Sequence, residues 1–285
     1  MCNIQSIQVS TRGAELQSLV ANGREYLWQG NPAYWGRCAP ILFPIVGKLA
    51  NDTLRIDGRE YTMKQHGFAR DTEFVYRFEK YMLAEDGRDN YPYAYELSAN
   101  YIAERNTLNC NWEVKNRGSN TMYFQIGAHP AFLLPEYNEA DEIHGYIQCF
   151  DADNNIVSPL LFNRLKDGLR VPYGTPKALL NEKQFLALTN TIFADDAILL
   201  EAKQVAKVAL FDKQGNRVLT VSCPQAEAFG LWAPNKLGCP FVCIEPWNGI
   251  ADKQGFKGDI FERDCICSLG SNEKYSFNYS ITIAE

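Results

Sequence analysis

The sequence has no long apolar run. None of its hydrophobic stretches approaches the about 20 residues that a transmembrane helix needs, so we expect no membrane partner. Residues 1–5 lack the basic and apolar regions of a secretory signal, and we therefore predict a cytoplasmic protein. The net charge of −6 gives a mildly acidic surface, which disfavours nucleic acid as a partner because its backbone is anionic too.

Histidine is scarce, and the cysteines form no recognisable ligand pattern. The chain has 3 histidines and 9 cysteines, an odd number of cysteines scattered along its length. Two close pairs, Cys239/Cys243 and Cys265/Cys267, match no two-plus-two zinc spacing. We expect reduced thiols that pack mostly as small core residues, and no metal site.

Several motifs of common enzyme classes are missing. The sequence contains no Gly-x-Ser-x-Gly elbow, no phosphate loop and no dinucleotide-binding glycine fingerprint. It also contains no low-complexity linker that would divide its 285 residues. Since 46% of the residues are hydrophobic, the chain can bury a sizeable core, and we predict one domain over residues 1–285.

Turn signals flanked by alternating apolar residues run through the chain. Asn22-Gly23 and Asp57-Gly58 are two-residue hairpin signals, because such turns need positive φ at both positions. Apolar and polar residues alternate over 108–114, which is typical of a half-buried strand. Helical signals are sparse, with one short helix predicted over 182–188. The pattern predicts an all-β fold, a large antiparallel sandwich or barrel with few short helices.

Two histidines and one carboxylate are the candidates for acid/base chemistry, and they lie in non-repetitive segments that also contain glycine, proline or aromatic residues. His66 lies in segment 65–70 and His129 in segment 127–132, whereas His144 stands among acidic residues and is expected on a solvated face. A strand-end imidazole such as His129 either exchanges a proton near neutral pH or serves only as a hydrogen-bonded turn residue. Glu245 ends an apolar strand, where partial burial would raise its pKa and make it a usable base.

Three further residues flank these segments. Trp247, two residues after Glu245, is either a surface on which a sugar stacks or a core residue. Arg37 and Lys48 bracket the apolar segment 39–47, where each is either a ligand-binding cation or ordinary surface charge.

Four of these segments together resemble the aldose 1-epimerase (galactose mutarotase) superfamily, in particular its shorter, lactose-operon-associated subgroup. They are Ala39-Pro40-Ile41-Leu42-Phe43-Pro44-Ile45-Val46-Gly47, Gln65-His66-Gly67-Phe68-Ala69-Arg70, Gly127-Ala128-His129-Pro130-Ala131-Phe132 and Ile244-Glu245-Pro246-Trp247-Asn248-Gly249. The resemblance implies a large antiparallel β-sandwich that interconverts the α and β anomers of a free sugar. It implies no metal and no organic cofactor.

The resemblance also implies roles for individual residues. Glu245 matches the general base that takes the proton of the anomeric hydroxyl, and His129 matches the general acid that protonates the ring oxygen. His66 matches the second histidine, which holds the sugar. An acidic residue that binds sugar hydroxyls corresponds to Asp195 or Asp196, and we prefer Asp196.

The resemblance leaves two questions open: which residue takes the place of the family's arginine, and which class of sugar is the substrate. Larger mutarotases carry an arginine ahead of the first histidine, and Lys48 or Arg37 would fill that role here. With Arg70, these cations could instead clamp a phosphate, which would make the chain an epimerase of hexose 6-phosphates. A third alternative is a non-catalytic sugar-binding or sensing module. The expected partner is a small sugar, and the oligomeric state stays open between monomer and homodimer.

Overall fold

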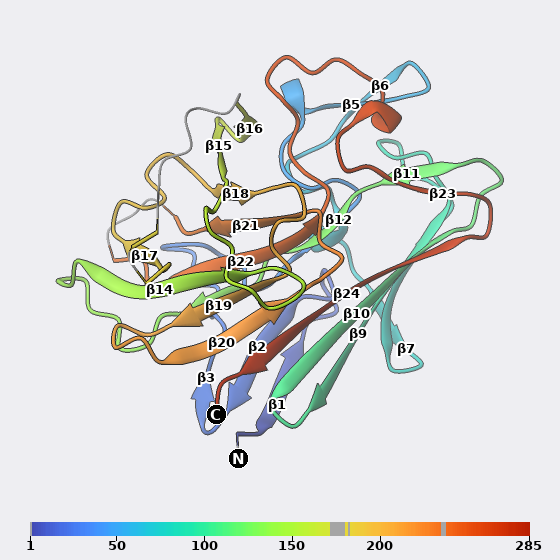
Figure 1. Cartoon of the computed structure of the whole chain (residues 1–285). Helices are drawn as coiled ribbons and strands as arrows, with labels where there is room; N and C mark the ends of the chain where they lie inside the picture. The colour runs from blue at the N-terminus through green and yellow to red at the C-terminus, as the bar shows by residue number, and fades with distance from the viewer. Residues whose placement is uncertain (1, 172–179, 182, 235–237) are drawn as a thin grey trace.

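The described part of the chain folds into sheets joined by loops and three short 3-10 turns (Figure 1). The computed structural model describes residues 2–171, 180–181, 183–234 and 238–285. Within these ranges there is no α-helix. The 3-10 turns are η1 (Ala50–Asp52), η2 (Ala69–Asp71) and η3 (Ile260–Glu262). No helix in the described ranges is long and apolar enough to cross a membrane.

Two large sheets dominate, and neighbouring strands in both are antiparallel. The nine-stranded sheet has the order β17 (Leu186–Thr189), β14 (Ile143–Phe150), β19 (Lys207–Phe211), β20 (Arg217–Ser222), β24 (Lys274–Ile283), β10 (Thr107–Asn116), β9 (Tyr95–Glu104), β8 (Lys80–Glu85), β7 (Val75–Arg77). The eight-stranded sheet has the order β16 (Leu169–Arg170), β15 (Asn163–Lys166), β18 (Ile198–Leu200), β21 (Ala228–Trp232), β22 (Phe241–Asn248), β12 (Ile126–Ala128), β4 (Ile41–Leu42), and β13 (Ala131–Leu133) also pairs with β22.

Three small sheets complete the fold. β1 (Ile4–Val9), β2 (Leu16–Ala21) and β3 (Arg24–Glu25) form one, near both chain ends (Figure 1). The other two are the hairpin of β5 (Thr53–Ile56) with β6 (Arg59–Thr62) and the pair of β11 (Met122–Phe124) with β23 (Cys267–Leu269).

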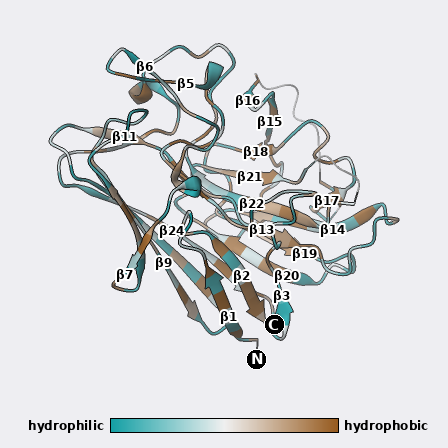
Figure 2. Ribbon diagram, turned by 180° about the vertical axis from the view of Figure 1, so that it is seen from behind, coloured by the Kyte–Doolittle hydropathy of each residue, from teal (hydrophilic) through white to brown (hydrophobic). Residues whose placement is uncertain are grey.

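One continuous hydrophobic core lies between the two large sheets. It contains Trp112 and Phe277 from the nine-stranded sheet and Phe229 and Ile244 from the eight-stranded sheet, all at most 1% exposed. Figure 2 shows hydrophobic residues along strands such as β14 and β19. Each fully buried large apolar side chain contributes about 1.5–3 kcal/mol. The predicted all-β antiparallel sandwich is confirmed, whereas the single-domain organisation stays a prediction.

Local patterns were accurate for the strands and hairpins. Every second residue of β10 is buried, as the alternation over 108–114 predicts. Asn22-Gly23 joins β2 to β3 and Asp57-Gly58 joins β5 to β6, with φ between 50° and 74° at all four positions. None of the 9 cysteines, all of them in the described ranges, forms a disulfide, and six are buried, so most pack as small core residues, as expected.

The predicted helix over 182–188 is wrong. Leu186 to Leu188 belong to strand β17, which pairs with β14, and residue 182 lies outside the described residues. Leu186 and Leu188 are buried while Ala187 and Thr189 are only partly buried. This period of two fits a sheet edge, and the tertiary pairing outweighs the weak local preference for a helix.

Candidate active site

Strand β22 places Glu245 at the base of a cleft. All eight residues of β22 are buried, and alternate residues face opposite sides of the sheet. Val242 and Ile244 point into the sandwich core, so Glu245 and Trp247 share the other face. Strand β12 pairs with β22 and ends one residue before His129. The Nε2 atom of His129 therefore lies 3.1 Å from the Oε2 atom of Glu245.

Trp247 packs flat against two glycines of neighbouring strands. A Cβ atom on Gly127 would lie 2.6 Å from the indole Cδ1, and one on Gly230 would lie 2.7 Å from Cζ2. Only residues without a side chain leave room for the ring, because real Cβ contacts are not that short. Trp247 is 3% exposed and still lines the cleft, so it is both a core residue and part of the site floor.

The cleft has a volume of about 390 Å³, within the about 300–1,000 Å³ typical of small-molecule sites. It brings together most of the residues singled out in the sequence. Its lining includes His66, His129, Glu245, Asp196, Lys48, Arg70 and Trp247.

Burial shifts the pKa values of Glu245 and His129 in opposite directions. Loss of water raises the pKa of Glu245 well above its usual value, and the nearby Asp196 charge raises it further. Burial, with the positive charge of Arg70, lowers the pKa of His129 to about 3. Burial therefore favours the neutral carboxyl form of Glu245 and the neutral imidazole form of His129.

The second histidine is held in a fixed tautomer by the backbone. The Gly47 N–H donates to Nδ1 of His66 over 3.1 Å, so the neutral ring carries its proton on Nε2. Burial and the charge of Arg70 lower the pKa of His66 well below its usual value, which keeps the ring neutral. The rings of His66 and His129 meet edge to face, with centroids 5.5 Å apart. His66 has a φ of 66°, a backbone conformation that non-glycine residues rarely adopt.

The structure separates the two aspartates that the sequence left open. Asp196 lines the cleft, whereas Asp195 is exposed and is not among the lining residues. Asp196 has a φ of 82°, and its Oδ1 accepts the N–H of Ala197 over 2.8 Å. These contacts fix the carboxylate beside the cleft.

The two candidate cations also differ in position. Lys48 lines the cleft, but Arg37 does not: its Nη2 pairs with Asp71 Oδ1 at 2.8 Å and it lines an adjoining depression. Arg70 reaches the cleft, and its Nη2 donates to the Gln65 carbonyl oxygen over 2.6 Å. The clamp of three cations considered for a phosphate is therefore not assembled in this cleft.

Several residues that line the cleft are not predicted from the sequence. The Trp35 ring stacks on His129 with centroids 4.8 Å apart and an interplanar angle of 25°, and Trp232 meets His129 edge-on at 5.8 Å. Gln65 and Asp167 line the cleft as well. The signal for Trp35 was its place in the aromatic segment beside Arg37. Trp232 had no local signal, because its position follows from the pairing of β21 with β22.

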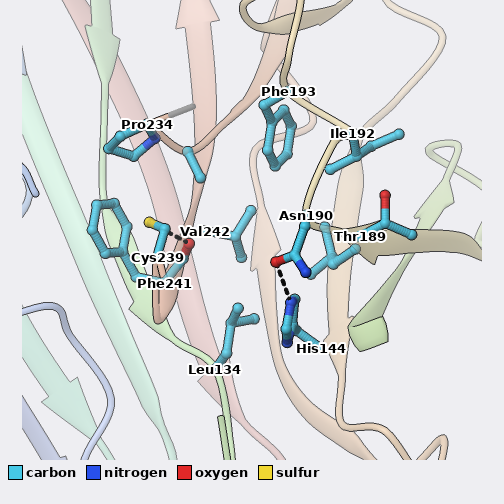
Figure 3. A pocket seen from close by; sticks show the side chains of 12 residues that line it. Leu134, His144, Thr189, Asn190, Ile192, Phe193, Pro234, Cys239, Phe241 and Val242 are labelled. Atoms are coloured by element: carbon cyan, nitrogen blue, oxygen red, sulfur yellow. Dashed lines mark hydrogen bonds between the residues drawn. The ribbon is translucent and has the colours of Figure 1, made fainter. Parts of the chain in front are cut away.

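His144 is not on a solvated face, as the sequence suggested. It is 4% exposed, and its Nε2 lies 2.7 Å from Asn190 Oδ1 (Figure 3). It lines a separate cavity of about 30 Å³, which has room for about one water molecule and none for a sugar. The strand face, and not the neighbouring acidic residues, decides the burial of this side chain.

Among the described residues, three side chains of types that can bind a metal ion lie close together near the floor of the cleft. Donor atoms of His129, Cys243 and Glu245 lie within 4.8 Å of one another, and all three residues are buried. Burial raises the pKa of the Cys243 thiol well above its usual value, so an ion would first have to displace the thiol proton. The expectation that the protein uses no metal stays a prediction.

Comparison with known proteins identifies the family. The aldose 1-epimerase family model matches residues 3–282. The chain is 31% identical over 271 residues to the LacX protein of Lactococcus lactis subsp. lactis, covering 90% of this chain and 89% of that protein.

Solved structures agree with this family. A galactose mutarotase related enzyme from Lactobacillus acidophilus matches with a TM-score of 0.85 and 31% identity, over 99% of this chain and 95% of that one. A galactose mutarotase-like protein from Lactobacillus casei matches with a TM-score of 0.86 and 26% identity, over 99% of both chains. This chain therefore belongs to the aldose 1-epimerase family, in the lactose-operon-associated subgroup that its motifs indicate.

Proposed function

We propose that this chain interconverts the α and β anomers of a free aldose through acid/base opening and closure of the sugar ring. The observation that carries the proposal is the 3.1 Å contact between His129 and Glu245 at the floor of a polar cleft of sugar size. Ring opening requires one group that accepts a proton readily and one that donates a proton readily, and the two pKa shifts give Glu245 the first property and His129 the second.

The reaction needs two proton transfers in each direction. Glu245, as carboxylate, accepts the proton of the anomeric hydroxyl while His129, as imidazolium, donates a proton to the ring oxygen. The C1–O5 bond then breaks and gives the open-chain aldehyde. Rotation about C1–C2 presents the other carbonyl face, and the reverse transfers close the ring. Each positioned acid or base contributes about 10²–10⁴-fold to the rate.

Burial favours the proton arrangement that the pair has after ring opening. After ring opening, Glu245 is protonated and His129 is neutral. Burial already favours this distribution, because it raises the pKa of Glu245 and lowers that of His129. Ring opening begins from the other arrangement, in which the carboxyl proton of Glu245 has moved to His129 across their 3.1 Å contact, and it returns the pair to the arrangement that burial favours.

The remaining cleft residues hold the sugar. His66 presents its Nε2–H from a tautomer fixed by Gly47. Asp196 accepts hydrogen bonds from sugar hydroxyls, and Lys48 donates them. Trp35 stacks on the His129 ring and restrains its rotation.

Polarimetry tests this proposal directly. Fresh α-glucose or α-galactose is followed with the wild-type chain and with Glu245→Gln and His129→Gln. We expect each substitution to lower kcat by about 10²–10⁴-fold. His144→Gln is the matched control, because it changes a buried histidine outside the cleft, and it should keep wild-type kcat. Catalysed rates unchanged in Glu245→Gln would remove this residue from the mechanism.

The two alternatives give different outcomes. A sugar-binding module would show saturable binding by calorimetry with no rate enhancement in polarimetry. An epimerase of phosphorylated sugars would show a higher kcat/KM for glucose 6-phosphate than for glucose.

A further inference from the structure

Strand β22 carries a thiol on the same face as Glu245. Cys243 lies two residues before Glu245, and alternate residues of a strand share a face. The thiol side chain is fully buried in a small cluster of apolar residues, and Trp35 and Trp232 pack against that cluster. The proposed proton transfers do not use this thiol, although it borders the reacting pair.

The thiol and the reacting pair have donor spacings close to those of a metal site. Donor atoms of His129, Cys243 and Glu245 all lie within 4.8 Å of one another. Nε2 of His129 and Oε2 of Glu245 are 3.1 Å apart, close to the about 3.3 Å between two such ligands of a tetrahedral zinc ion. The sulfur of Cys243 turns about a single side-chain bond, so it can move toward an ion that the other two residues hold.

An unpartnered oxygen points to the same place. Oε2 of Glu245 is buried, and it has no hydrogen-bond partner in the described part of the chain. Its contact with Nε2 of His129 is an ion pair only when the imidazole is protonated. A buried acceptor without a partner is costly. A cation between the two atoms satisfies both, because a carboxylate and a neutral imidazole each offer it a lone pair.

The donor types select the ion. Thiolate, imidazole and carboxylate together suit Zn²⁺, whereas Mg²⁺ and Ca²⁺ prefer oxygen ligands. Three protein ligands leave a fourth position for water on the side of the cleft, which His129 and Glu245 line. When the ion binds, the S–H bond of Cys243 breaks as the S–Zn bond forms, and the proton passes to the buffer. No electron is transferred in this step.

We propose that His129, Cys243 and Glu245 form an inhibitory site for Zn²⁺ at the floor of the cleft. The ion occupies both groups of the proposed acid/base pair, so neither of them transfers a proton while it is bound. The inference adds a regulation of the site proposed above. The loss of activity therefore rests on the proposed function, whereas binding of the ion does not.

Metal binding is measured first, without a sugar, on the chain after dialysis against EDTA. Calorimetry with Zn²⁺ should show a tightly bound ion, and Co²⁺ in its place should give a thiolate-to-cobalt charge-transfer band. Cys243→Ala should remove this band and weaken Zn²⁺ binding at least about 100-fold, because even residues that only support metal ligands change the affinity by about 10–100-fold.

Cys110→Ala is the matched control. Cys110 is also fully buried, but it belongs to β10 and does not line the cleft. This variant should keep both the charge-transfer band and the wild-type affinity for Zn²⁺. If Cys243→Ala does not fold by near-UV circular dichroism, Cys243→Ser takes its place, since a serine hydroxyl is a poor ligand for zinc.

Polarimetry with glucose then measures inhibition, with each protein compared with its own rate in the absence of metal. Zn²⁺ should abolish the catalysed rate of the wild-type chain, and EDTA should restore it. Half-inhibition of Cys243→Ala should need at least about 100-fold more Zn²⁺, as its weaker binding requires. An equal inhibitory concentration for both proteins would show that the ion acts elsewhere and would overturn the proposal.

The remaining outcomes distinguish this inference from the proposed function. A chain that turns over glucose but shows neither the charge-transfer band nor binding of Zn²⁺ refutes the metal site and leaves the proposed function intact. A chain that binds Zn²⁺ through Cys243 but does not accelerate mutarotation refutes the proposed function and keeps the metal site.

Discussion

Acidification should destabilise the fold through His129, and the structure gives the size of the effect. Its pKa falls from 6.5 to about 3 because the ring is buried next to positive charge. Each pKa unit corresponds to about 1.4 kcal/mol, so protonating His129 in the folded chain costs up to about 5 kcal/mol. The pKa is depressed by folding, so the stabilisation is complete above about pH 6.5 and is lost as pH falls toward 3.

Urea unfolding at about pH 7.5 and about pH 5 measures this loss, and linkage predicts about 2 kcal/mol from His129 over that interval. His129→Gln removes the titrating group and keeps a neutral polar side chain. The variant should therefore lose about 2 kcal/mol less than the wild-type chain between the two pH values. His66 is present in both proteins, so most of its own contribution cancels in the comparison.

The near-UV circular dichroism of both proteins at both pH values shows whether the folded states being compared are equivalent. If His129→Gln loses as much free energy of unfolding on acidification as the wild-type chain, the imidazole is not held neutral by burial. The proton arrangement inferred for the His129–Glu245 pair would then be wrong.

Three further predictions concern the site and the packing around it. Gly127→Ala forces a Cβ against the Trp247 indole at 2.6 Å, and we expect a loss of about 1–3 kcal/mol of stability in urea unfolding together with reduced mutarotation. Arg263 pairs with Asp252 at 2.8 Å, and the two side chains are only 2% and 4% exposed. Asp252→Asn removes the counter-charge of this buried guanidinium and should lower the free energy of unfolding by about 3–5 kcal/mol, and a loss below about 1 kcal/mol would contradict this. Lys48→Met should raise KM for glucose about ten-fold while the unfolding midpoint stays at the wild-type value, and an unchanged KM would remove Lys48 from sugar binding.

The sequence determined the strands, the hairpins and the acid/base candidates. Alternation over 108–114 and the turns at Asn22-Gly23 and Asp57-Gly58 need only neighbouring residues, because side-chain direction in a strand and φ in a tight turn are local properties. The motifs around His66, His129 and Glu245 likewise marked dense, non-repetitive segments, and the cleft contains all three.

Only the tertiary structure decided which side chains share the cleft. Asp196 enters it while Asp195 does not, and Lys48 enters it while Arg37 turns to Asp71. His144 is buried although its neighbours in the sequence are acidic, and Leu186, which the sequence predicts in a helix, belongs to a strand.

The physical reason is that the burial of a side chain and its contacts depend on which strands pair in the sheet. His129 meets Glu245 because β12 pairs with β22, although 116 positions separate the two residues in the sequence. The pKa shifts of the pair come from the water that this pairing excludes, and no local pattern in the chain encodes that exclusion.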